Sequence, residues 1–529
     1  MTGVQTCALP IFIDVSPGRF VFTGTGYTVT VLNAEVLQAD AGGGSDSANF
    51  TGTDGDDTFT ARPGSAQIIA AGLNAQVNNV ETIGATAGSG GTQDVATLYD
   101  SAGDDVGQIT PTGAVLSGTG FRLEVSGFDF THLVAKNGGN DAVLFVGTAG
   151  QDEFVARPDY STMTLTNGTF YRAKGFKAVE IAAPAGNQSS IKFVDSAGDD
   201  TFQADPTTAT LRGAGYEIVA HRVAYVHAYS RNGGFDSAYL YGSDGDDRIV
   251  VDQQFMKIYG DSYLLRAKGF ELTIADALDG ADSAKVLDTA GDDTVTAEPY
   301  TFRLQTRKQE FRGYGVETQD IRSIYGGTDT VSLYDSTYDD VLTAQPNYAG
   351  LTGPGYAITV RAYDSVYAYS RSGHDIAHLT GSSGDDQFVG DAVSGRLSGL
   401  GFLLRAKNFS EVYVQSGGGR DTAVLKATAA VDQIFANGLD AVLENATFKY
   451  ALRAFSRVQV NGSGANDLAE VWNGQILHQE YDLDGNPLPE PDVAVMVTLN
   501  DVAQVRVRSD VPPQDETVDG LGQTFKFFW

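Results

Sequence analysis

The sequence predicts an all-β protein, a parallel β-solenoid (β-helix) built from about ten repeats of about 47 residues. Three observations predict this fold. An Asp-containing turn recurs at steps of 46 to 48 residues, apolar residues alternate at period two in short runs, and no segment keeps a helical period over three turns. The 529 residues therefore describe an array of mutually supporting repeats rather than three or four separate domains.

The first recurring element is a turn with the pattern G-T/S-x-G-x-D-x-(F/I/V), degenerate in places. A second Asp precedes the first column by 11 residues wherever both are present, which predicts a short strand between two turns. The first column consists of Asp57, Asp105, Asp152, Asp200, Asp247, Asp293, Asp340, Asp386 and Asp432. The second column consists of Asp46, Asp94, Asp141, Asp236, Asp282, Asp329, Asp375, Asp421 and Asp467, with Ser189 in the vacant slot.

The strands follow from the residues between the turns. In the repeat that starts at Asp200, alternation predicts short strands broken by Gly, Pro and Asp. The residues of this alternating pattern are Phe202 and Ala204, Ala209 and Leu211, Val223, Tyr225 and His227, and Ala238 and Leu240. A G-x-G-(Y/F) phrase recurs at Gly24, Gly118, Gly213, Gly353 and Gly399, and we expect its glycines to supply a bulge or a positive φ at a corner.

Two architectures use repeats of this length. A β-propeller takes 40 to 50 residues per blade but typically closes with about four to eight blades, whereas a solenoid has no such limit. We therefore predict a solenoid, with a propeller-like arrangement as the alternative. Because 47 residues are about twice what one three-sided coil of about 20 residues needs, each repeat has enough chain for two coils.

The chain divides into four segments. Residues 1–11, MTGVQTCALPI, resemble the translation of a sequencing-library adapter, and they contain the only cysteine, Cys7. We assign residues 12–470 to the repeat array, 471–510 to a divergent β cap and 511–529 to a tail. We also expect the array to have continued upstream, so an export signal is not observable.

The charge limits the partners. With 35 Lys and Arg against 67 Asp and Glu, the formal charge is −32, which excludes a nucleic-acid-binding role because the phosphate backbone would be repelled. No run of about 18 apolar residues predicts a membrane span. Hydrophobic residues make up 42% of the chain, enough for a folded core.

Several turns resemble the calcium-binding nonapeptide of the repeats-in-toxin family of secreted bacterial proteins. The similar segments are GTDGDDTFT at Gly52–Thr60, GTAGQDEFV at Gly147–Val155, GSDGDDRIV at Gly242–Val250 and GSSGDDQFV at Gly381–Val389. The resemblance implies calcium at the first-column turns, at Asp57, Asp105, Asp152, Asp200, Asp247, Asp293, Asp340 and Asp386. The alternative is that each Asp caps its own turn, because only one nonapeptide occurs per repeat and calcium needs six to eight oxygens.

Arginine and tyrosine supply a second group of candidates. Arginine recurs near the G-x-G-Y corners, and a Tyr-x-Arg sequence at Tyr229 and Arg231 has a counterpart at Tyr369 and Arg371. Arginine pairs with acidic groups and aromatic rings stack on sugars, so these four residues are candidate glycan contacts. The alternatives are structural: arginine pairing within the protein, and aromatic residues facing the core.

No nucleophile motif or helical zinc pair is visible among the six histidines, so an enzyme is the less favoured interpretation. The phrases D-S-A-G-D-D, R-A-K-G-F and G-G-x-D-x-A are similar to those of large, acidic, secreted repeat proteins of environmental bacteria. This resemblance implies an extracellular or cell-surface location and a structural or adhesive role. The alternative function is a polysaccharide-binding or polysaccharide-degrading β-helix.

Overall fold

The structure, a computed structural model, describes residues 9–437, 440–463, 467–473, 496–509, 515–519 and 524–528. Residues 474–495, which make up most of the expected cap, lie outside this described part. So do residues 1–8 of the adapter-like segment and parts of the expected tail. The chain forms two compact bodies, one comprising residues up to Ser243 together with Gln254–Ala275, and the other comprising Asp244–Gln253 together with the chain from Asp276 onward.

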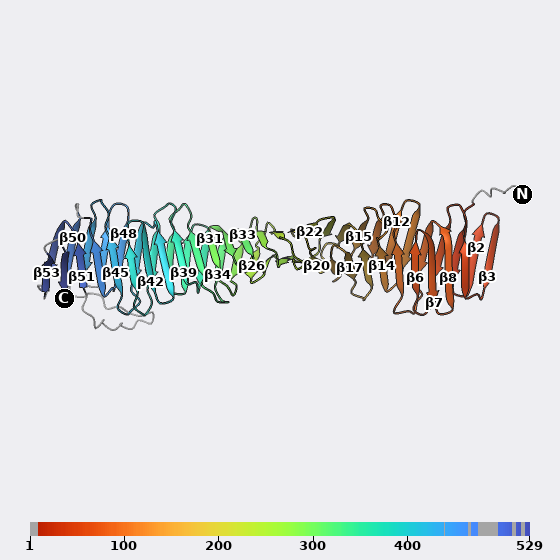
Figure 1. Ribbon diagram of the computed structural model, residues 1–529, viewed down its shortest axis with the longest axis horizontal. Coiled ribbons are helices and arrows are strands. Elements are labelled where there is room, and N and C mark those ends of the chain that lie inside the picture. The colour runs from red at the N-terminus through yellow and green to blue at the C-terminus, as the bar shows by residue number, and fades with distance from the viewer. Residues whose placement is uncertain are drawn as a thin grey trace. The chain divides into compact units, whose positions relative to one another are not determined.

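The predicted fold class is confirmed. The elements of the described residues are all strands, and they stack as a parallel β-solenoid of about 13 turns (Figure 1). In each body the strands belong to two sheets, called A and B, whose inner faces share the core. No helix in the part of the chain that the structure describes is long and apolar enough to cross a bilayer.

The strands of the first body have the following bounds. Sheet A contains β1 (Phe12–Ser16), β2 (Arg19–Gly24), β3 (Tyr27–Leu32), β5 (Ser47–Thr51), β9 (Thr82–Thr86), β11 (Val106–Thr110), β12 (Gly113–Gly118), β13 (Phe121–Ser126), β15 (Ala142–Val146), β19 (Ala178–Ala182), β21 (Thr201–Ala204), β22 (Thr208–Gly213), β23 (Tyr216–His221), β25 (Ser237–Tyr241) and β29 (Leu272–Asp276). Sheet B contains β4 (Val36–Asp40), β6 (Thr58–Arg62), β7 (Gly64–Ala70), β8 (Leu73–Val80), β10 (Val95–Tyr99), β14 (Phe130–Val134), β16 (Glu153–Ala156), β17 (Tyr160–Thr164), β18 (Phe170–Lys174), β20 (Ser190–Val194), β24 (Tyr225–Tyr229), β27 (Phe255–Tyr259) and β28 (Leu264–Lys268).

The strands of the second body also form two sheets, which are given the same letters. Sheet A contains β31 (Thr294–Glu298), β32 (Tyr300–Gln305), β33 (Glu310–Val316), β35 (Thr330–Tyr334), β39 (Ser365–Tyr369), β41 (Gln387–Gly390), β42 (Ser394–Gly399), β43 (Phe402–Lys407), β45 (Thr422–Lys426), β49 (Arg457–Asn461), β51 (Met496–Asn500), β53 (Asp515–Asp519) and β54 (Thr524–Phe528). Sheet B contains β26 (Arg248–Asp252), β30 (Ser283–Leu287), β34 (Thr318–Arg322), β36 (Val341–Gln345), β37 (Tyr348–Gly353), β38 (Tyr356–Arg361), β40 (Ile376–Thr380), β44 (Glu411–Gln415), β46 (Gln433–Asn437), β47 (Asp440–Glu444), β48 (Lys449–Arg453), β50 (Leu468–Asn473) and β52 (Gln504–Ser509).

Each repeat supplies a three-stranded antiparallel meander followed by two single strands. The repeat that begins at Asp105 places β11, β12 and β13 in sheet A, β14 in sheet B and β15 in sheet A. The next repeat, from Asp152, places its meander β16–β18 in sheet B instead. Consecutive repeats therefore exchange the roles of the two sheets. The array has about 13 turns, so each repeat forms fewer than the two coils that its length allows.

The meander runs backward along the solenoid axis. In sheet A, β13 pairs in parallel with β9, and β11 pairs in parallel with β15, so the strands stack in the order β9, β13, β12, β11, β15. The chain thus places β11 three strand positions beyond β9, and β12 and β13 then fill the two positions between them. This path joins antiparallel hairpins to parallel ladders within one sheet.

The core follows the predicted alternation with one correction. Phe202, Ala204, Leu211 and Leu240 are buried as expected, and the centroids of the Phe193 and Phe202 rings, which come from opposite sheets, lie 5.4 Å apart. In β24, however, the prediction is wrong by one residue. Val226 and Ala228 point inward, whereas Tyr225 is 43% exposed and His227 is only half-buried on the outer face.

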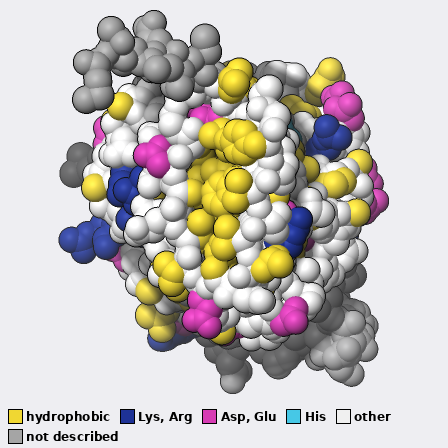
Figure 2. All heavy atoms as spheres, turned by 90° about the vertical axis from the view of Figure 1, so that its right-hand side faces the viewer, with side chains coloured by type: hydrophobic (Ala, Val, Ile, Leu, Met, Phe, Trp, Pro, Cys, Tyr) yellow, Lys and Arg dark blue, Asp and Glu magenta, His cyan; other side chains and the backbone are white. Residues whose placement is uncertain are grey.

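Among the described residues, β3 pairs with β2 alone and forms an open edge of the first body. On β3, Val29 and Val31 are 49% and 37% exposed, although their counterparts on β13, Leu123 and Val125, are 0% and 1% exposed beneath β9. Figure 2, which faces this end, shows apolar side chains gathered in the middle of the surface. The edge strands β3 and β4 therefore expose residues that are covered by a neighbouring strand at the equivalent positions of interior coils.

Candidate functional site

The Asp columns lie in the turns at the two edges where the chain passes between the sheets. Asp105 follows a turn from sheet B to sheet A, whereas Asp57 and Asp152 follow turns from sheet A to sheet B. The sequence columns therefore divide between two opposite edges, with successive repeats alternating. Strand β10 separates Asp94 from Asp105, which confirms the short strand predicted by the 11-residue offset.

First-column carboxylates close their own turns. Asp105 accepts hydrogen bonds from the backbone N–H of Ser101 at 2.7 Å and from its hydroxyl, and Ser101 in turn accepts the N–H of Gly103. The carboxylate thus binds the residue four positions before it in the chain. The hydroxyl of that residue accepts the backbone N–H of the residue two positions after it. The same arrangement occurs at Asp57, Asp152, Asp200, Asp293, Asp340, Asp386 and Asp432.

Second-column carboxylates connect neighbouring coils. Oδ1 of Asp141 accepts the N–H of Asp105 at 2.9 Å, and Oδ1 of Asp236 accepts the N–H of Asp200 at 2.8 Å. Where serine occupies the vacant slot, the Ser189 hydroxyl accepts the N–H of Asp152 at 3.2 Å. The same bond is made by Asp94, Asp282, Asp329, Asp375, Asp421 and Asp467.

Sequence reasoning missed three further sets of acidic residues with the same task. Each accepts a backbone N–H from a turn 35 to 37 residues away in either direction along the chain. The sets are Asp100, Asp195, Asp288 and Asp335; Asp56, Asp104, Asp199, Asp246, Asp292, Asp339 and Asp385; and Glu81, Asp129, Glu271, Glu317 and Asp364. The D-S-A-G-D-D phrase contains the signal, because its first and fifth residues are members of these sets.

The G-x-G-(Y/F) corner packs against the first column. The second glycine, Gly215, has the positive φ of 82° that a two-residue hairpin turn needs, which confirms that expectation. The first, Gly213, leaves room for the Asp200 carboxylate and the Tyr216 ring. The Tyr216 hydroxyl donates to Oδ1 of Asp200 at 2.8 Å, and burial together with this carboxylate raises the pKa of Tyr216.

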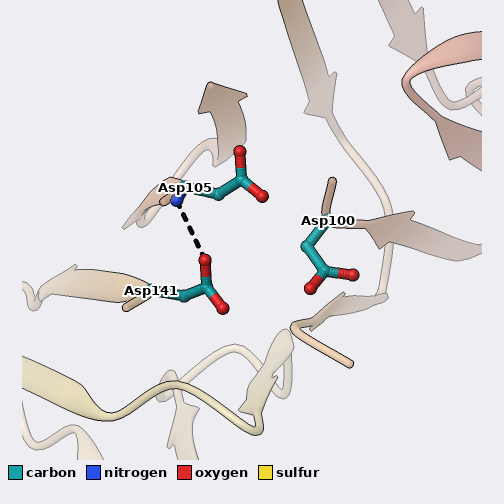
Figure 3. A group of neighbouring side chains, drawn as sticks. All are labelled: Asp100, Asp105 and Asp141. Carbon is teal, nitrogen blue, oxygen red and sulfur yellow. Dashed lines mark hydrogen bonds between the residues drawn. The ribbon is translucent and has the colours of Figure 1, made fainter. Parts of the chain in front are cut away.

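Three groups of buried aspartates bring their carboxylates together. In each group, one oxygen per residue lies within 4.8 Å of the others, and all three residues are buried. The triads are Asp100, Asp105 and Asp141; Asp288, Asp293 and Asp329; and Asp335, Asp340 and Asp375. Figure 3 shows the first triad, whose carboxylates surround a common space while the Asp105 N–H bonds to Asp141.

Each triad has one carboxylate oxygen that accepts no hydrogen bond from the described residues. In two triads this atom is buried: Oδ1 of Asp293 and Oδ2 of Asp335. In the third it is Oδ2 of Asp141, whose other oxygen accepts the Asp105 N–H. A buried carboxylate oxygen without a donor is costly unless a proton or a cation satisfies it. Two carboxylates about 4.8 Å apart repel by about 3.5 kcal/mol at an effective dielectric constant of about 20, so a divalent cation would relieve each triad.

Burial changes the acidity of these columns. Desolvation, with Glu317 and Asp247 nearby, raises the pKa of Asp282 to about 6. Burial likewise raises the pKa of Asp335, beside Asp375 and Asp340, and the pKa values of Asp94, Asp141, Asp236, Asp329 and Asp421. These carboxyl groups therefore hold protons more tightly in the folded chain than in the unfolded chain.

The raised pKa of Asp282 predicts that stability in chelator falls as pH rises. Between an unfolded pKa of about 4 and the folded pKa of about 6, the folded carboxyl group is protonated while the unfolded one is ionised. Folding then binds protons, so the contribution of Asp282 to the unfolding midpoint should decrease between pH 4 and pH 6 and level off above. Midpoints measured by circular dichroism across this range test it.

The matched variant is Asp282→Asn, whose amide oxygen can still accept the N–H of Asp247, 2.6 Å from the carboxylate in the native chain. We expect the variant to flatten this part of the pH profile and to be the more stable chain at pH 8. A native midpoint that rises from pH 4 to pH 6 contradicts the expectation. The carboxylates with lowered pKa, Glu310 and Asp320 beside their arginines, lose their contribution only below about pH 4.

The structure places the predicted metal ligands in two classes. Asp105, Asp293 and Asp340 belong to the triads, whereas Asp57, Asp152, Asp200, Asp247 and Asp386 lie in equivalent turns outside these three groups. The other six triad members were not among the predicted metal ligands: Asp100, Asp141, Asp288, Asp329, Asp335 and Asp375.

The candidate glycan contacts lie on outer faces. Arg231 lies over the Tyr229 ring at 4.3 Å, on sheet B of the first body. In the second body, Tyr369 stacks on Tyr334 in sheet A at 4.8 Å, and Arg371 lies over Tyr334 and pairs with Glu298. The two Tyr–Arg pairs therefore do not belong to one strand column.

The fold and the edge turns define a class of protein, an acidic two-sheet β-solenoid in which carboxylates serve as acceptors for the turn N–H groups. Comparison with protein-family models and with curated proteins finds no match to this chain.

Proposed function

We propose that this chain is a non-enzymatic structural protein of the extracellular space or cell surface, a spacer with adhesive properties whose edge turns bind calcium. The observation that supports it best is the set of three buried Asp triads, two of which hold a buried carboxylate oxygen that lacks a donor among the described residues. Calcium prefers carboxylate and carbonyl oxygens, and water and turn carbonyls can complete its six to eight ligands.

The ligand number also suits the proposed location. A site with three carboxylates and little further protein coordination fits the weak class of calcium sites, with dissociation constants of about 10⁻⁴ to 10⁻³ M, that extracellular modules use. The described residues contain no cysteine, so the fold depends on stacking and turn hydrogen bonds rather than on disulfides.

Calcium should raise the thermal stability of the chain. At about 100 times its dissociation constant, a ligand that binds only the folded state stabilises it by about 2.7 kcal/mol per site. We expect the midpoint in EDTA to increase by several degrees on addition of excess CaCl₂, and to increase less with MgCl₂, which needs a stricter octahedral site. Circular dichroism melts measure the change, and an unchanged midpoint would rule out calcium stabilisation.

Two variants with the same change in charge localise the effect. Asp335→Asn removes one triad carboxylate but keeps an oxygen for the Arg371 N–H, 2.8 Å from Asp335 in the native chain. Asp339→Asn changes an exposed neighbour that lies outside the triads. We expect only Asp335→Asn to reduce the calcium-induced shift in the second body.

The geometry supports binding or scaffolding better than cleavage. The Asp columns are buried in the edge turns, where their oxygens accept turn N–H groups, whereas the Arg and Tyr side chains of β24 and β28 occupy the outer face of sheet B. A glycan-cleaving site would need carboxylates on the face that meets the substrate.

A further inference from the structure

A column of basic side chains runs along the outer face of sheet B in the first body. The strands stack there in the order β14, β18, β17, β16, β20, β24, β28, β27. One outward position per strand forms the column, whose residues are His132, Arg172, Thr162, Val155, Lys192, His227, Arg266 and Lys257. Lys174 and Lys268 lie in the next column.

These cations are unpaired within the described part of the chain. No Lys or Arg of the two columns forms an ion pair or a side-chain hydrogen bond with any residue in the described part of the chain. Nε of Arg172 and Nε of Arg266 are buried atoms without an acceptor, as is Nδ1 of His227. The outward residues of the three columns on these strands include one carboxylate, Glu153.

Aromatic rings border the basic column on both sides. Arg266 lies over the Phe255 ring at 4.3 Å, and Lys257 lies over Tyr259 at 4.6 Å. Tyr225 and Tyr229 face outward on either side of His227. The outer face of sheet B thus has a central row with four Lys or Arg side chains, flanked by rows that contain aromatic rings.

The opposite face of the same body has no such basic column. In sheet A the corresponding column contains Glu124 and Glu180 and no lysine or arginine between β13 and β23. The arginines at its side, Arg122 and Arg212, are paired with Glu124 at 2.9 Å and with Glu217 at 2.5 Å. The excess of unpaired cations therefore belongs to one face, in a chain with a net charge of −32.

The alternation of repeats produces this difference. The sequence R-A-K occurs at Arg172 and Arg266, in repeats whose meanders both lie in sheet B, whereas the intervening repeat places Glu217 and Val219 in sheet A. The repeats that begin at Asp152 and Asp247 both place their meanders in sheet B, and these two repeats supply its cations.

We infer that this face of sheet B binds an extended acidic polysaccharide, with uronate carboxylates on the Arg and Lys column and sugar rings against the flanking aromatics. Guanidinium and ammonium groups pair with carboxylates, and aromatic faces stack on the apolar faces of sugars. The inference names a partner for the extracellular role proposed above and rests on that role for its setting. It does not require calcium.

The charge density favours a carboxylated glycan over nucleic acid. Strand spacing of about 4.8 Å places roughly six Lys and Arg along eight strands, a density far below the one phosphate per about 1.7 Å of duplex DNA. The acidic remainder of the molecule repels a dense phosphate backbone more strongly than a sparsely charged glycan.

Binding of fluorescently labelled polygalacturonate to the full chain tests the inference, with its fully methyl-esterified form and a single-stranded DNA oligonucleotide as competitors. We expect binding at low ionic strength that weakens with added salt, and no competition by the neutral ester. The Arg172→Gln/Arg266→Gln variant should bind at least tenfold more weakly.

The matched control is Arg122→Gln/Arg212→Gln, which makes the same change in charge on sheet A and should alter binding less than twofold. Equal weakening by both variants, equal binding of the ester, tighter binding of the oligonucleotide, or no binding to polygalacturonate overturns the inference. Repeating the titration in EDTA separates this inference from the calcium proposal. Polysaccharide binding should persist in EDTA, and the calcium-induced change in melting midpoint should occur without polysaccharide.

Discussion

Asp200→Ala should destabilise the first body by about 4 kcal/mol, which lowers its melting midpoint by on the order of 10 °C. The native carboxylate accepts the Ser196 N–H at 2.6 Å, the Ser196 hydroxyl and the Tyr216 hydroxyl. Alanine leaves these donors without their acceptor beside a buried ring, and the cost of an unsatisfied buried donor is about 1–3 kcal/mol each. Circular dichroism melts in EDTA measure the loss.

Asp199→Ala is the control, because it makes the same change in charge one residue away. Asp199 is exposed, and water can replace its bond to the Phe235 N–H. We expect a loss below about 1 kcal/mol. Hydrogen exchange should show faster exchange at Ser196–Tyr216 in Asp200→Ala alone, and equal midpoints for the two variants would contradict the role of the first column.

Gly213→Ala should cost about 3 kcal/mol although its backbone conformation is open to alanine. A Cβ atom at this position would overlap with Oδ1 of Asp200 and with the Tyr216 ring, so the methyl group displaces the carboxylate from its turn donors. The loss should be smaller in the Asp200→Ala background, because one of the two obstacles is absent there. Unfolding midpoints of the two single variants and the double variant form the cycle that measures this coupling.

Gly24→Ala makes the same substitution in the same phrase at the open edge. There the three atoms nearest to a Cβ atom would all belong to the side chain of Tyr27, which is 50% exposed and free to turn aside. We expect a loss below about 1 kcal/mol. A loss at Gly24 as large as the one at Gly213 would show that the glycine is needed for backbone reasons instead.

The sequence predicted the class of fold because its evidence is local. Turns at Gly and Asp and alternation over five residues are properties of short segments, and both are found in the structure. The exchange of sheets between repeats was not predictable in this way, since each repeat has nearly the same pattern whichever sheet holds its meander. The one-residue error in β24 has a local cause, because Tyr225, His227 and Tyr229 alternate as regularly as Val226 and Ala228.

The candidate site was predicted in part for a related reason. That Asp105 closes a turn is visible within five residues, from Ser101 to Asp105. That Asp141 accepts the Asp105 N–H depends on which coils become neighbours, and so does the approach of Asp100 to both. The polar outer face of β24 was underestimated because a column of cations exists only after strands from several repeats are placed side by side.

The alternation of repeats between sheets has a consequence for how such arrays can lengthen or shorten. Within a body, loss or duplication of a single repeat would transfer the outward residues of every later repeat to the opposite face, so a basic column would be split between two surfaces. Loss or duplication of a pair of repeats leaves each residue on its original face. Recombination that preserves surface chemistry must therefore act on pairs, and the heritable module of this protein is twice the repeat seen in its sequence.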